Sequence, residues 1–310
     1  MKKVFVDGGA GTTGLRINER LALRDDIELI ILPETERKDT ECRRRAINSC
    51  DIAFLCLPDD AAREAVQLTD NPNVVIFDTS TAHRTNQDWA YGFPELSNEL
   101  WEKVKGSKRI AVPGCHASGF IALVYPLLAS GVISPDSRLV CQSITGYSGG
   151  GKKMIAEYQS EDRSPLLCAP RQYGLSQQHK HLKEMTSISG LMSAPFFSPI
   201  VSDFYSGMAV TVPLFKADLQ KNADAGYIKD IYRKAYIGPV VSFKEDADEA
   251  GFLSALALSG KDTMEISVNG NEDRILLTAR YDNLGKGASG AAVECMNIVL
   301  GIEPTKGLEV

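Results

Sequence analysis

Short apolar runs alternate with longer amphipathic stretches through the first third of the chain. The apolar runs cover residues 3–6, 28–32, 52–57, 74–78 and 109–112. Their starts are separated by roughly 20 to 35 residues, as in βα units, and continuous apolar strands are typical of a parallel sheet buried on both faces. The pattern therefore predicts an N-terminal Rossmann-like parallel sheet.

The pattern changes after residue 137. Strands are predicted at 139–144, 208–214, 264–268 and 274–281, and helices at 217–236 and, rich in Gly and Ala, at 285–300. Residues 164–203, rich in Ser, Pro and Gly, indicate a functional loop around a short helix. The turn-rich segment 269–273 joins two of the strands, which favours antiparallel pairing. We expect an α/β protein whose second, α+β domain has a mixed, largely antiparallel sheet, with one domain formed by 1–114 plus 285–310 and the other by 115–284.

Composition excludes several classes of protein. The chain has 310 residues, 24% of them charged, and a net charge of −6 without a long block of one sign, so no nucleic-acid surface is expected. No apolar run is long enough to span a bilayer, and the start of the chain reads as a strand and not a signal peptide. The seven cysteines lack a paired metal spacing. They indicate reduced thiols in a cytoplasmic protein without a metal site.

A glycine-rich loop follows the first predicted strand. Gly8, Gly11 and Gly14 recur at intervals of three, with Thr12 and Thr13 between them. Glycine lets the backbone approach a pyrophosphate, which amides at a helix N-terminus then hold. The loop predicts a dinucleotide site, and a tight turn without a ligand is the alternative.

Two basic residues follow the second predicted strand. Arg37 and Lys38 stand where a dinucleotide enzyme contacts the ribose, and they favour NADP because they can pair with a 2′-phosphate. Glu34 and Glu36 in the same segment leave an exposed charged loop as the alternative.

Cys115 is the candidate nucleophile. It follows Val-Pro-Gly, where an apolar strand ends and a new amphipathic run begins, so it should lie at a helix N-terminus that stabilises a thiolate. A buried, inert cysteine is the alternative. His179 and His181 are candidate acid/base groups. Two residues apart, their rings face opposite ways on a strand or lie roughly 200° apart on a helix, so we expect them not to share one role. His83 and His116 are weaker candidates.

Two further segments suit anions. Arg84, in the Asp-Thr-Ser-Thr-Ala-His-Arg run at 78–84 that includes Ser80, could hold a phosphate or carboxylate or be an ordinary surface arginine. The Gly-Tyr-Ser-Gly-Gly-Gly-Lys run at 146–152, with Tyr147 and Gly149, suits an amide cradle or a flexible hairpin tip.

Together these segments resemble the N-acetyl-gamma-glutamyl-phosphate reductases, specifically the shorter, type 2 form. The resemblance extends over nearly the whole chain and rests on the glycine loop, 78–84, Tyr-Gly-Phe-Pro-Glu-Leu at 91–96, Val-Pro-Gly-Cys at 112–115, 179–184, and Asp-Asn-Leu-Gly-Lys-Gly-Ala-Ser-Gly at 282–290. His116, Ser118 and Lys183 depart from the common pattern, which has an aromatic residue, Thr and Pro there.

The resemblance implies reductive dephosphorylation of an acyl phosphate in arginine biosynthesis. By analogy, Cys115 attacks the gamma-acyl phosphate of N-acetylglutamate, inorganic phosphate leaves, and NADPH delivers hydride to the thioester. The resemblance suggests His179 as acid/base with His181 nearby, an NADP-binding first domain, and a catalytic and dimerisation second domain in a homo-oligomer, dimer or tetramer. It implies cofactor contacts at Pro58, Ser80, Gly149 and Asn283, and substrate contacts at Arg84, Ser118 and Tyr147.

Three alternatives remain open at this point. Aspartate-semialdehyde dehydrogenase and a reductase for the longer aminoadipyl phosphate share the mechanism. A non-catalytic NADP-sensing protein belongs to another class, and the combination of Cys115 with the histidine pair argues against it. The sequence does not separate the roles of the two histidines or fix the oligomeric state.

Overall fold

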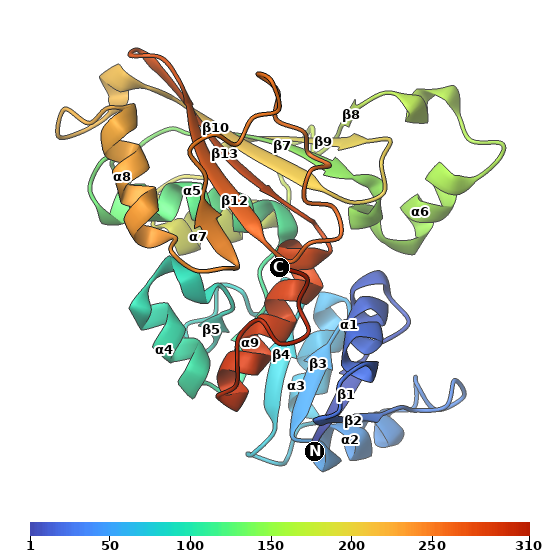
Figure 1. Cartoon of the computed structure of the whole chain (residues 1–310). Coiled ribbons are helices and arrows are strands. Elements are labelled where there is room, and N and C mark those ends of the chain that lie inside the picture. Colours follow the sequence, from blue (N-terminus) through green and yellow to red (C-terminus); the bar gives the residue numbers. More distant parts are fainter. The chain divides into compact units, whose positions relative to one another are not determined.

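The computed structural model describes residues 1–310, which form two compact units (Figure 1). Unit 1 comprises Met1–Pro94, Asn98–Gly114 and Ala288–Leu308. Unit 2 comprises Glu95–Ser97, Cys115–Gly287 and Glu309–Val310. The chain thus leaves the first unit at Gly114 and returns to it near the C-terminus.

Unit 1 contains a six-stranded sheet in the order β2-β1-β3-β4-β6-β5, and every pairing in it is parallel. Its strands are β1 (Lys2–Asp7), β2 (Ile27–Ile30), β3 (Ile52–Leu55), β4 (Val75–Asp78), β5 (Ala90–Tyr91) and β6 (Arg109–Ala111). The predicted parallel sheet is confirmed. Strand β5 was missed because two residues are too few to form an apolar run.

Helices cover both faces of this sheet. They are α1 (Thr12–Ala22), α2 (Thr40–Ser49), α3 (Asp59–Gln67), α4 (Asn98–Gly106) and α9 (Gly290–Leu300). Along β1, Val4 and Val6 join the core formed with α1, α4 and α9, whereas Phe5 joins the core formed with α2 and α3. Because alternate strand residues enter different cores, both faces require apolar side chains.

Unit 2 contains a seven-stranded mixed sheet in the order β11-β12-β13-β10-β7-β9-β8. Its strands are β7 (Val140–Gly146), β8 (Arg171–Gln172), β9 (Phe196–Ser202), β10 (Met208–Phe215), β11 (Val241–Phe243), β12 (Met264–Gly270) and β13 (Arg274–Tyr281). Only the β11–β12 and β7–β9 pairings are parallel. The predicted mixed, largely antiparallel sheet is therefore confirmed.

One face of this sheet is covered by helices (Figure 1). They are α5 (Cys115–Ala129), α7 (His181–Ser189) and α8 (Ala225–Ala235). Residues that face them, such as Val210 on β10 and Leu277 on β13, are fully buried. On the opposite face Phe215 of β10 is 60% exposed and Leu276 of β13 is 38% exposed.

Four predicted segments differ from the structure. The helix expected at 217–236 is limited to α8, and the 3₁₀ turn η4 (Lys216–Asp218) precedes it. The helix does not start earlier because Lys221 and Asn222 adopt left-handed φ angles of 58° and 51°. Asp224 then caps α8 by accepting a hydrogen bond from the Tyr227 amide. The 285–300 helix begins as the π-helical turn η5 (Gly285–Ser289). The expected 146–152 loop is the turn η2 (Tyr147–Gly150) followed by α6 (Gly151–Gln159).

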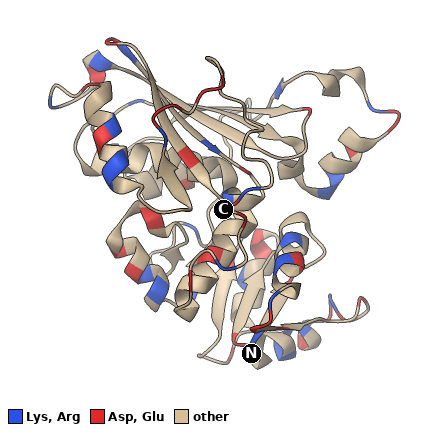
Figure 2. Ribbon diagram, viewed as in Figure 1, with Lys and Arg blue, Asp and Glu red and all other residues tan.

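The loop expected at 164–203 includes strands β8 and β9 as well as the predicted short helix, which is α7, and the 3₁₀ turn η3 (Pro165–Cys168). The remaining 3₁₀ turn is η1 (Pro94–Leu96). No helix has the length and apolar character needed to cross a membrane. Basic and acidic side chains are interspersed along exposed helices, as on α8 (Figure 2).

Candidate active site

The glycine loop crosses the carboxyl ends of the unit 1 strands. Strand β1 lies between β2 and β3, which is the switch point where parallel sheets bind ligands. Gly8 has a φ of 79°, and a Cβ there would lie 2.2 Å from the carbonyl oxygen of Cys56. A Cβ on Gly14 would lie 2.6 Å from the carbonyl oxygen of Gly8. Glycine at both positions thus allows the loop to fold against the end of β3.

The N-terminus of α1 follows this loop and offers unused donors. Helix α1 begins at Thr12, and its N-cap residue Gly11 provides no side-chain hydrogen bond to the first turn. The Thr12 hydroxyl is buried without a hydrogen-bond partner. Free amides and an orphaned hydroxyl at a helix N-terminus fit the phosphates of a dinucleotide. Thr13, in the same turn, is half-buried.

Other predicted cofactor contacts lie at the same edge of the unit 1 sheet. Pro58 is the N-cap residue of α3, directly after β3. Ser80, after β4, donates from its amide to Asp78 Oδ1 (2.9 Å) and from its hydroxyl to Asp78 Oδ2 (2.8 Å). Asp78 also lies 2.6 Å from Nδ1 of His83, whose ring stacks on Trp89. The structure brings Pro58 and Ser80 to the edge where the glycine loop lies.

Arg37 and Lys38 occupy an exposed turn after β2. Arg37 Nε donates to the Leu32 carbonyl at 3.3 Å. Sequence reasoning missed a third basic residue nearby, Arg43 of α2, which is buried and pairs with Asp7 at the end of β1 at 3.0 Å. Burial raises the pKa of Asp7, although the Arg43 hydrogen bond acts in the opposite direction. This pair holds α2 against the strand that leads into the glycine loop.

Arg84 is buried and not at the surface. Its Nε donates to the Val112 carbonyl at 2.9 Å, and its NH2 group donates to the Thr79 carbonyl at 2.8 Å. The guanidinium therefore fixes the chain three residues before Cys115. Its contact with substrate stays a prediction.

Cys115 is half-buried and is the first residue of α5. The expected location at a helix N-terminus is confirmed. The hydroxyl of Tyr281 on β13 bridges the first turn of α5: it accepts from the Gly119 amide at 3.0 Å and donates to the Cys115 carbonyl at 2.5 Å. A Cβ on Gly119 would lie 2.6 Å from that hydroxyl, and one on Gly287 would lie 3.1 Å from the Cys115 Cβ. Small residues thus leave room around the cysteine.

Three histidine rings gather beside the cysteine. The ring of His116 lies 5.9 Å from that of His179 and 5.6 Å from that of His181, centre to centre. The rings of His179 and His181 are 4.8 Å apart. The two rings therefore lie together and not on opposite sides of one regular element, and the expectation that they do not share one role stays a prediction. His179 precedes α7 in a turn and His181 is its first residue, so neither ideal strand nor ideal helix geometry applies.

Burial keeps part of this cluster uncharged. It lowers the pKa of His116 to about 3, with a smaller contribution from His179. Burial, and secondarily the charge of Lys180, also lowers the pKa of His179. The backbone amide of His181 donates to His179 Nδ1 at 3.2 Å. Neutral His179 therefore carries its proton on Nε2 in this arrangement.

The predicted contacts after β7 and β13 meet within unit 2. Asn283 accepts from the Gly207 amide at 3.0 Å and donates to the Ser148 hydroxyl at 2.9 Å. A Cβ on Gly149 would lie 3.5 Å from the same Asn283 amide nitrogen. Tyr147 stacks on Tyr158 with ring centres 4.6 Å apart. Ser118, on α5, is buried.

Sequence reasoning also missed a buried ion pair. Lys286, which is 1% exposed, lies 2.6 Å from the carboxylate of Glu95. Both residues belong to segments quoted for the family resemblance, but 191 positions separate them and no local pattern pairs them.

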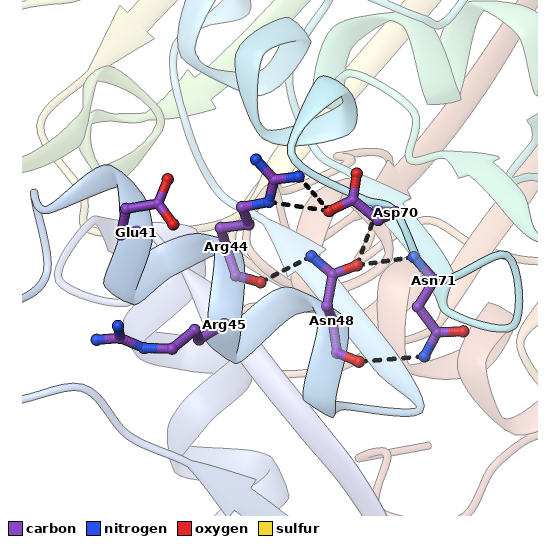
Figure 3. A pocket seen from close by; sticks show the side chains of 6 residues that line it. All are labelled: Glu41, Arg44, Arg45, Asn48, Asp70 and Asn71. Carbon is purple, nitrogen blue, oxygen red and sulfur yellow. Dashed lines mark hydrogen bonds and ion pairs between the residues drawn. The ribbon is translucent and has the colours of Figure 1, made fainter.

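A separate cavity of about 440 Å³ lies on unit 1 between α2 and the segment after α3 (Figure 3). The six residues that line it all carry polar or charged side chains: Glu41, Arg44, Arg45, Asn48, Asp70 and Asn71. Arg44 pairs with Asp70 at 2.5 Å, and Asn48 Oδ1 accepts from the amides of Asp70 and Asn71. None of the predicted site residues lines this cavity.

Two protein-family models match the chain. Residues 33–104 match the semialdehyde dehydrogenase NAD binding domain, and residues 115–283 match the semialdehyde dehydrogenase dimerisation domain. The second match begins at Cys115 and includes the histidine cluster.

Curated relatives match over nearly their whole length. The N-acetyl-gamma-glutamyl-phosphate reductase of Trichormus variabilis is 45% identical over 318 aligned residues, which cover 99% of each chain. The Rhizobium etli enzyme of the same name is 44% identical over 305 residues, covering 96% of this chain and 98% of the relative.

Solved structures share the fold at low sequence identity. Aspartate semialdehyde dehydrogenase II of Vibrio cholerae has a TM-score of 0.73 at 18% identity, covering 97% of this chain and 98% of that one. The Candida albicans aspartate semialdehyde dehydrogenase, solved with NADP, has a TM-score of 0.67 at 14% identity, covering 97% and 98%.

Proposed function

Because the chain belongs to the N-acetyl-gamma-glutamyl-phosphate reductase family, we propose that it reduces N-acetyl-gamma-glutamyl phosphate to N-acetylglutamate semialdehyde and phosphate through a thioester on Cys115. The reaction is a step of arginine biosynthesis. The observation that carries the thioester route is the position of Cys115 at the N-terminus of α5, beside a histidine cluster. Helix amides stabilise the thiolate, which is the attacking form of cysteine.

The chemistry divides into two steps at one carbon. The thiolate attacks the acyl carbon, the C–S bond forms, and the C–O bond to phosphate breaks with its electron pair leaving on phosphate. NADPH, when bound, supplies the hydride for the reduction. Cleavage of the C–S bond then releases the aldehyde and returns the sulfur as a thiolate. A thioester resists hydrolysis better than an acyl phosphate, so Cys115 separates phosphate release from reduction.

We assign the acid/base role to the histidine pair, with His179 as the first candidate. His179 is half-exposed and can meet a substrate, whereas His181 is only 5% exposed. Proton uptake at Nε2 of His179 requires its Nδ1 to give up the bond from the His181 amide. This requirement is why both residues need to be tested.

The cofactor proposal is NADP, bound by residues 1–114 with 285–310. The glycine loop, the uncapped α1 and the buried Thr12 hydroxyl suit the pyrophosphate. The exposed Arg37 and Lys38 suit the 2′-phosphate. Residues 115–284 form the catalytic and dimerisation domain in this proposal.

We further propose a cytoplasmic homo-oligomer, a dimer or tetramer. The helix-free face of the unit 2 sheet supports self-association, because neighbouring strands expose Ile144, Phe196, Phe215 and Leu276 on it. None of the seven cysteines forms a disulfide, in keeping with a reducing compartment.

The reverse reaction tests the proposed function. NADP reduction is followed with N-acetylglutamate, aspartate or aminoadipate semialdehyde, each with phosphate. We expect turnover with the first substrate, none in Cys115→Ala, and very little in Cys115→Ser, because a hydroxyl is hardly ionised near neutral pH. Cys141→Ala is the matched control, since Cys141 is a buried thiol on β7. Phosphate-dependent turnover by Cys115→Ala would rule out the thioester route, and a preference for another semialdehyde would reassign the substrate.

A further inference from the structure

Two buried tyrosines, Tyr236 and Tyr281, donate their hydroxyl groups to carbonyls of α5. The bond of Tyr236, which reaches the Ala122 carbonyl at 2.6 Å, has a structural reason. Pro126 lies inside α5, four residues after Ala122, and it has no amide hydrogen to give to that carbonyl. Because a buried carbonyl without a donor is costly, the Tyr236 hydroxyl takes the place of the missing helical bond.

No missing amide accounts for the bonds of Tyr281. Its hydroxyl donates to the Cys115 carbonyl at 2.5 Å and accepts from the Gly119 amide at 3.0 Å. Gly119 lies four residues after Cys115, so its amide is the ordinary helical partner of that carbonyl. An amide only donates and a carbonyl only accepts, which fixes the phenol proton on the carbonyl. The hydroxyl thus bonds to both ends of the one helical turn that begins at the proposed nucleophile.

The glycine at position 119 gives this hydroxyl its space. A Cβ there would lie 2.6 Å from the Tyr281 hydroxyl and 2.7 Å from Cγ2 of Val210 on β10. Glycine weakens the interior of a helix relative to alanine. The close approach of the phenol to α5 accounts for its use at this position.

The phenol itself is held firmly in place. Tyr281 is the last residue of β13 and pairs with Met208 of β10 and Met264 of β12, and all three residues are fully buried. A Cβ on Gly287 would lie 3.1 Å from the Cys115 Cβ and 3.3 Å from Cε2 of Tyr281, so ring, cysteine and glycine pack together. Burial raises the pKa of Tyr281 well above its ordinary value, and the hydroxyl therefore stays a donor.

A fixed carbonyl at Cys115 also fixes the amide that follows it. The Cys115 carbonyl and the His116 amide belong to one planar peptide unit, so the direction of one sets the direction of the other. The His116 amide lies in the first turn of α5, whose amides point toward the N-terminal end and stabilise a thiolate there. Building on the proposed role of Cys115, we propose that Tyr281 is a positioning residue, whose hydroxyl sets the first turn of α5 and thereby holds the cysteine in its attacking geometry.

Steady-state kinetics of the reverse reaction test this role in the full-length protein. Tyr281→Phe removes only the hydroxyl group. We expect kcat with N-acetylglutamate semialdehyde, phosphate and NADP to fall about ten- to a hundredfold, because a displacement of about 1 Å at a reacting group can cost about a hundredfold. The KM values for semialdehyde and NADP should stay within about twofold of wild type, because no contact with either molecule is removed.

Alkylation by iodoacetamide reports on the cysteine without any substrate. The Cys115 peptide of the intact protein is quantified by mass spectrometry after timed exposure at pH 7. We expect Tyr281→Phe to react about two- to fivefold more slowly than wild type, because misaligned first-turn amides stabilise a smaller fraction of thiolate.

Tyr236→Phe is the matched control, because it removes the same group from a buried tyrosine bonded to the same helix. It should lower the melting temperature at least as much as Tyr281→Phe, since the Ala122 carbonyl is left without a donor while the Cys115 carbonyl keeps the Gly119 amide within its own turn. Its kcat and its rate of alkylation should stay near wild type. Gly119→Ala is a second test of the role, because its Cβ displaces the Tyr281 hydroxyl and should reproduce the loss of kcat even if Tyr281→Phe does not fold.

Wild-type kcat in both Tyr281→Phe and Gly119→Ala would overturn the positioning role. Equal kinetic losses in Tyr281→Phe and Tyr236→Phe would also overturn it, because that result reports general damage to α5. If wild type turns over no semialdehyde while Tyr281→Phe still slows the alkylation of Cys115, the proposed function is refuted and the assignment of Tyr281 stands.

Discussion

The buried ion pair between Lys286 and Glu95 is the contact whose loss should destabilise unit 2 most clearly. Lys286→Met keeps the length of the side chain but leaves the Glu95 carboxylate, 11% exposed, without its partner at 2.6 Å. Removing one member of a buried pair costs about 3 to 5 kcal/mol, because the remaining charge is desolvated and uncompensated. For a unit of this size, about 2 to 4 °C per kcal/mol predicts a fall in melting temperature of about 6 to 20 °C.

Thermal unfolding followed by circular dichroism measures this change, with the lower transition used if the two units melt separately. Lys229→Met is the matched control, because it breaks the exposed pair with Glu245, and we expect it to cost less than about 1 kcal/mol. The double variant Lys286→Met with Glu95→Gln should recover part of the loss, since no charge is left buried. Equal destabilisation by Lys286→Met and Lys229→Met, or a double variant as unstable as the sum of both changes, would refute the reasoning.

Three further outcomes are expected. Arg37→Ala should weaken NADP binding about 5- to 150-fold and leave NAD binding unchanged, because one charged contact to a phosphate contributes about 1 to 3 kcal/mol. Calorimetric titration with both cofactors measures this effect, with Arg45→Ala as the control. Equal losses of NADP and NAD affinity would contradict it. His179→Asn should lower the single-turnover rate about a hundred- to ten-thousandfold, as expected for a positioned acid/base; a collapse in His181→Asn alone would reverse the assignment, and near-wild-type rates in both would remove histidine from the mechanism. The pKa of His116 is about 3 in the folded state and 6.5 ordinarily, so between these pH values only the unfolded chain binds the extra proton. The stability that is present above pH 6.5 should therefore be lost as the pH falls toward 3. In urea unfolding, His116→Gln should give a flatter dependence of stability on pH than wild type, and an identical dependence would exclude this linkage.

The fold was largely predictable because its strands follow local rules. Strand β1 sends Val4 and Val6 to one core and Phe5 to the other, so both faces require apolar residues, and the continuous run is visible in the sequence. The helix start at Cys115 was predictable for a similar reason. Pro113 and Gly114 interrupt the strand immediately before it, so the new apolar run had to begin another element.

The contacts around the cysteine were not predictable, because they join residues far apart in the chain. Tyr281 reaches Cys115 across 166 positions, and His116 meets Tyr173 across 57 positions. Nothing local distinguishes these tyrosines from the others, since their partners are set by the register of β13 and the path of the chain after β8. A site residue can be nominated from its own segment, but its protonation and hydrogen bonds depend on neighbours that only the tertiary fold supplies.

The position of the histidine rings has a consequence for catalysis. The spacing argument placed His179 and His181 on one regular strand or helix. In the structure, the turn before α7 brings their rings together next to that of His116. Burial in this cluster lowers the pKa of His116 and of His179, so neither imidazole provides a standing positive charge near neutral pH. The amides at the N-terminus of α5 are donors that can stabilise a thiolate at Cys115 without a charged His116 or His179. Neutral His179 can act as a base once its Nδ1 gives up the bond from the His181 amide, so the cluster favours base chemistry over a permanent thiolate–imidazolium pair.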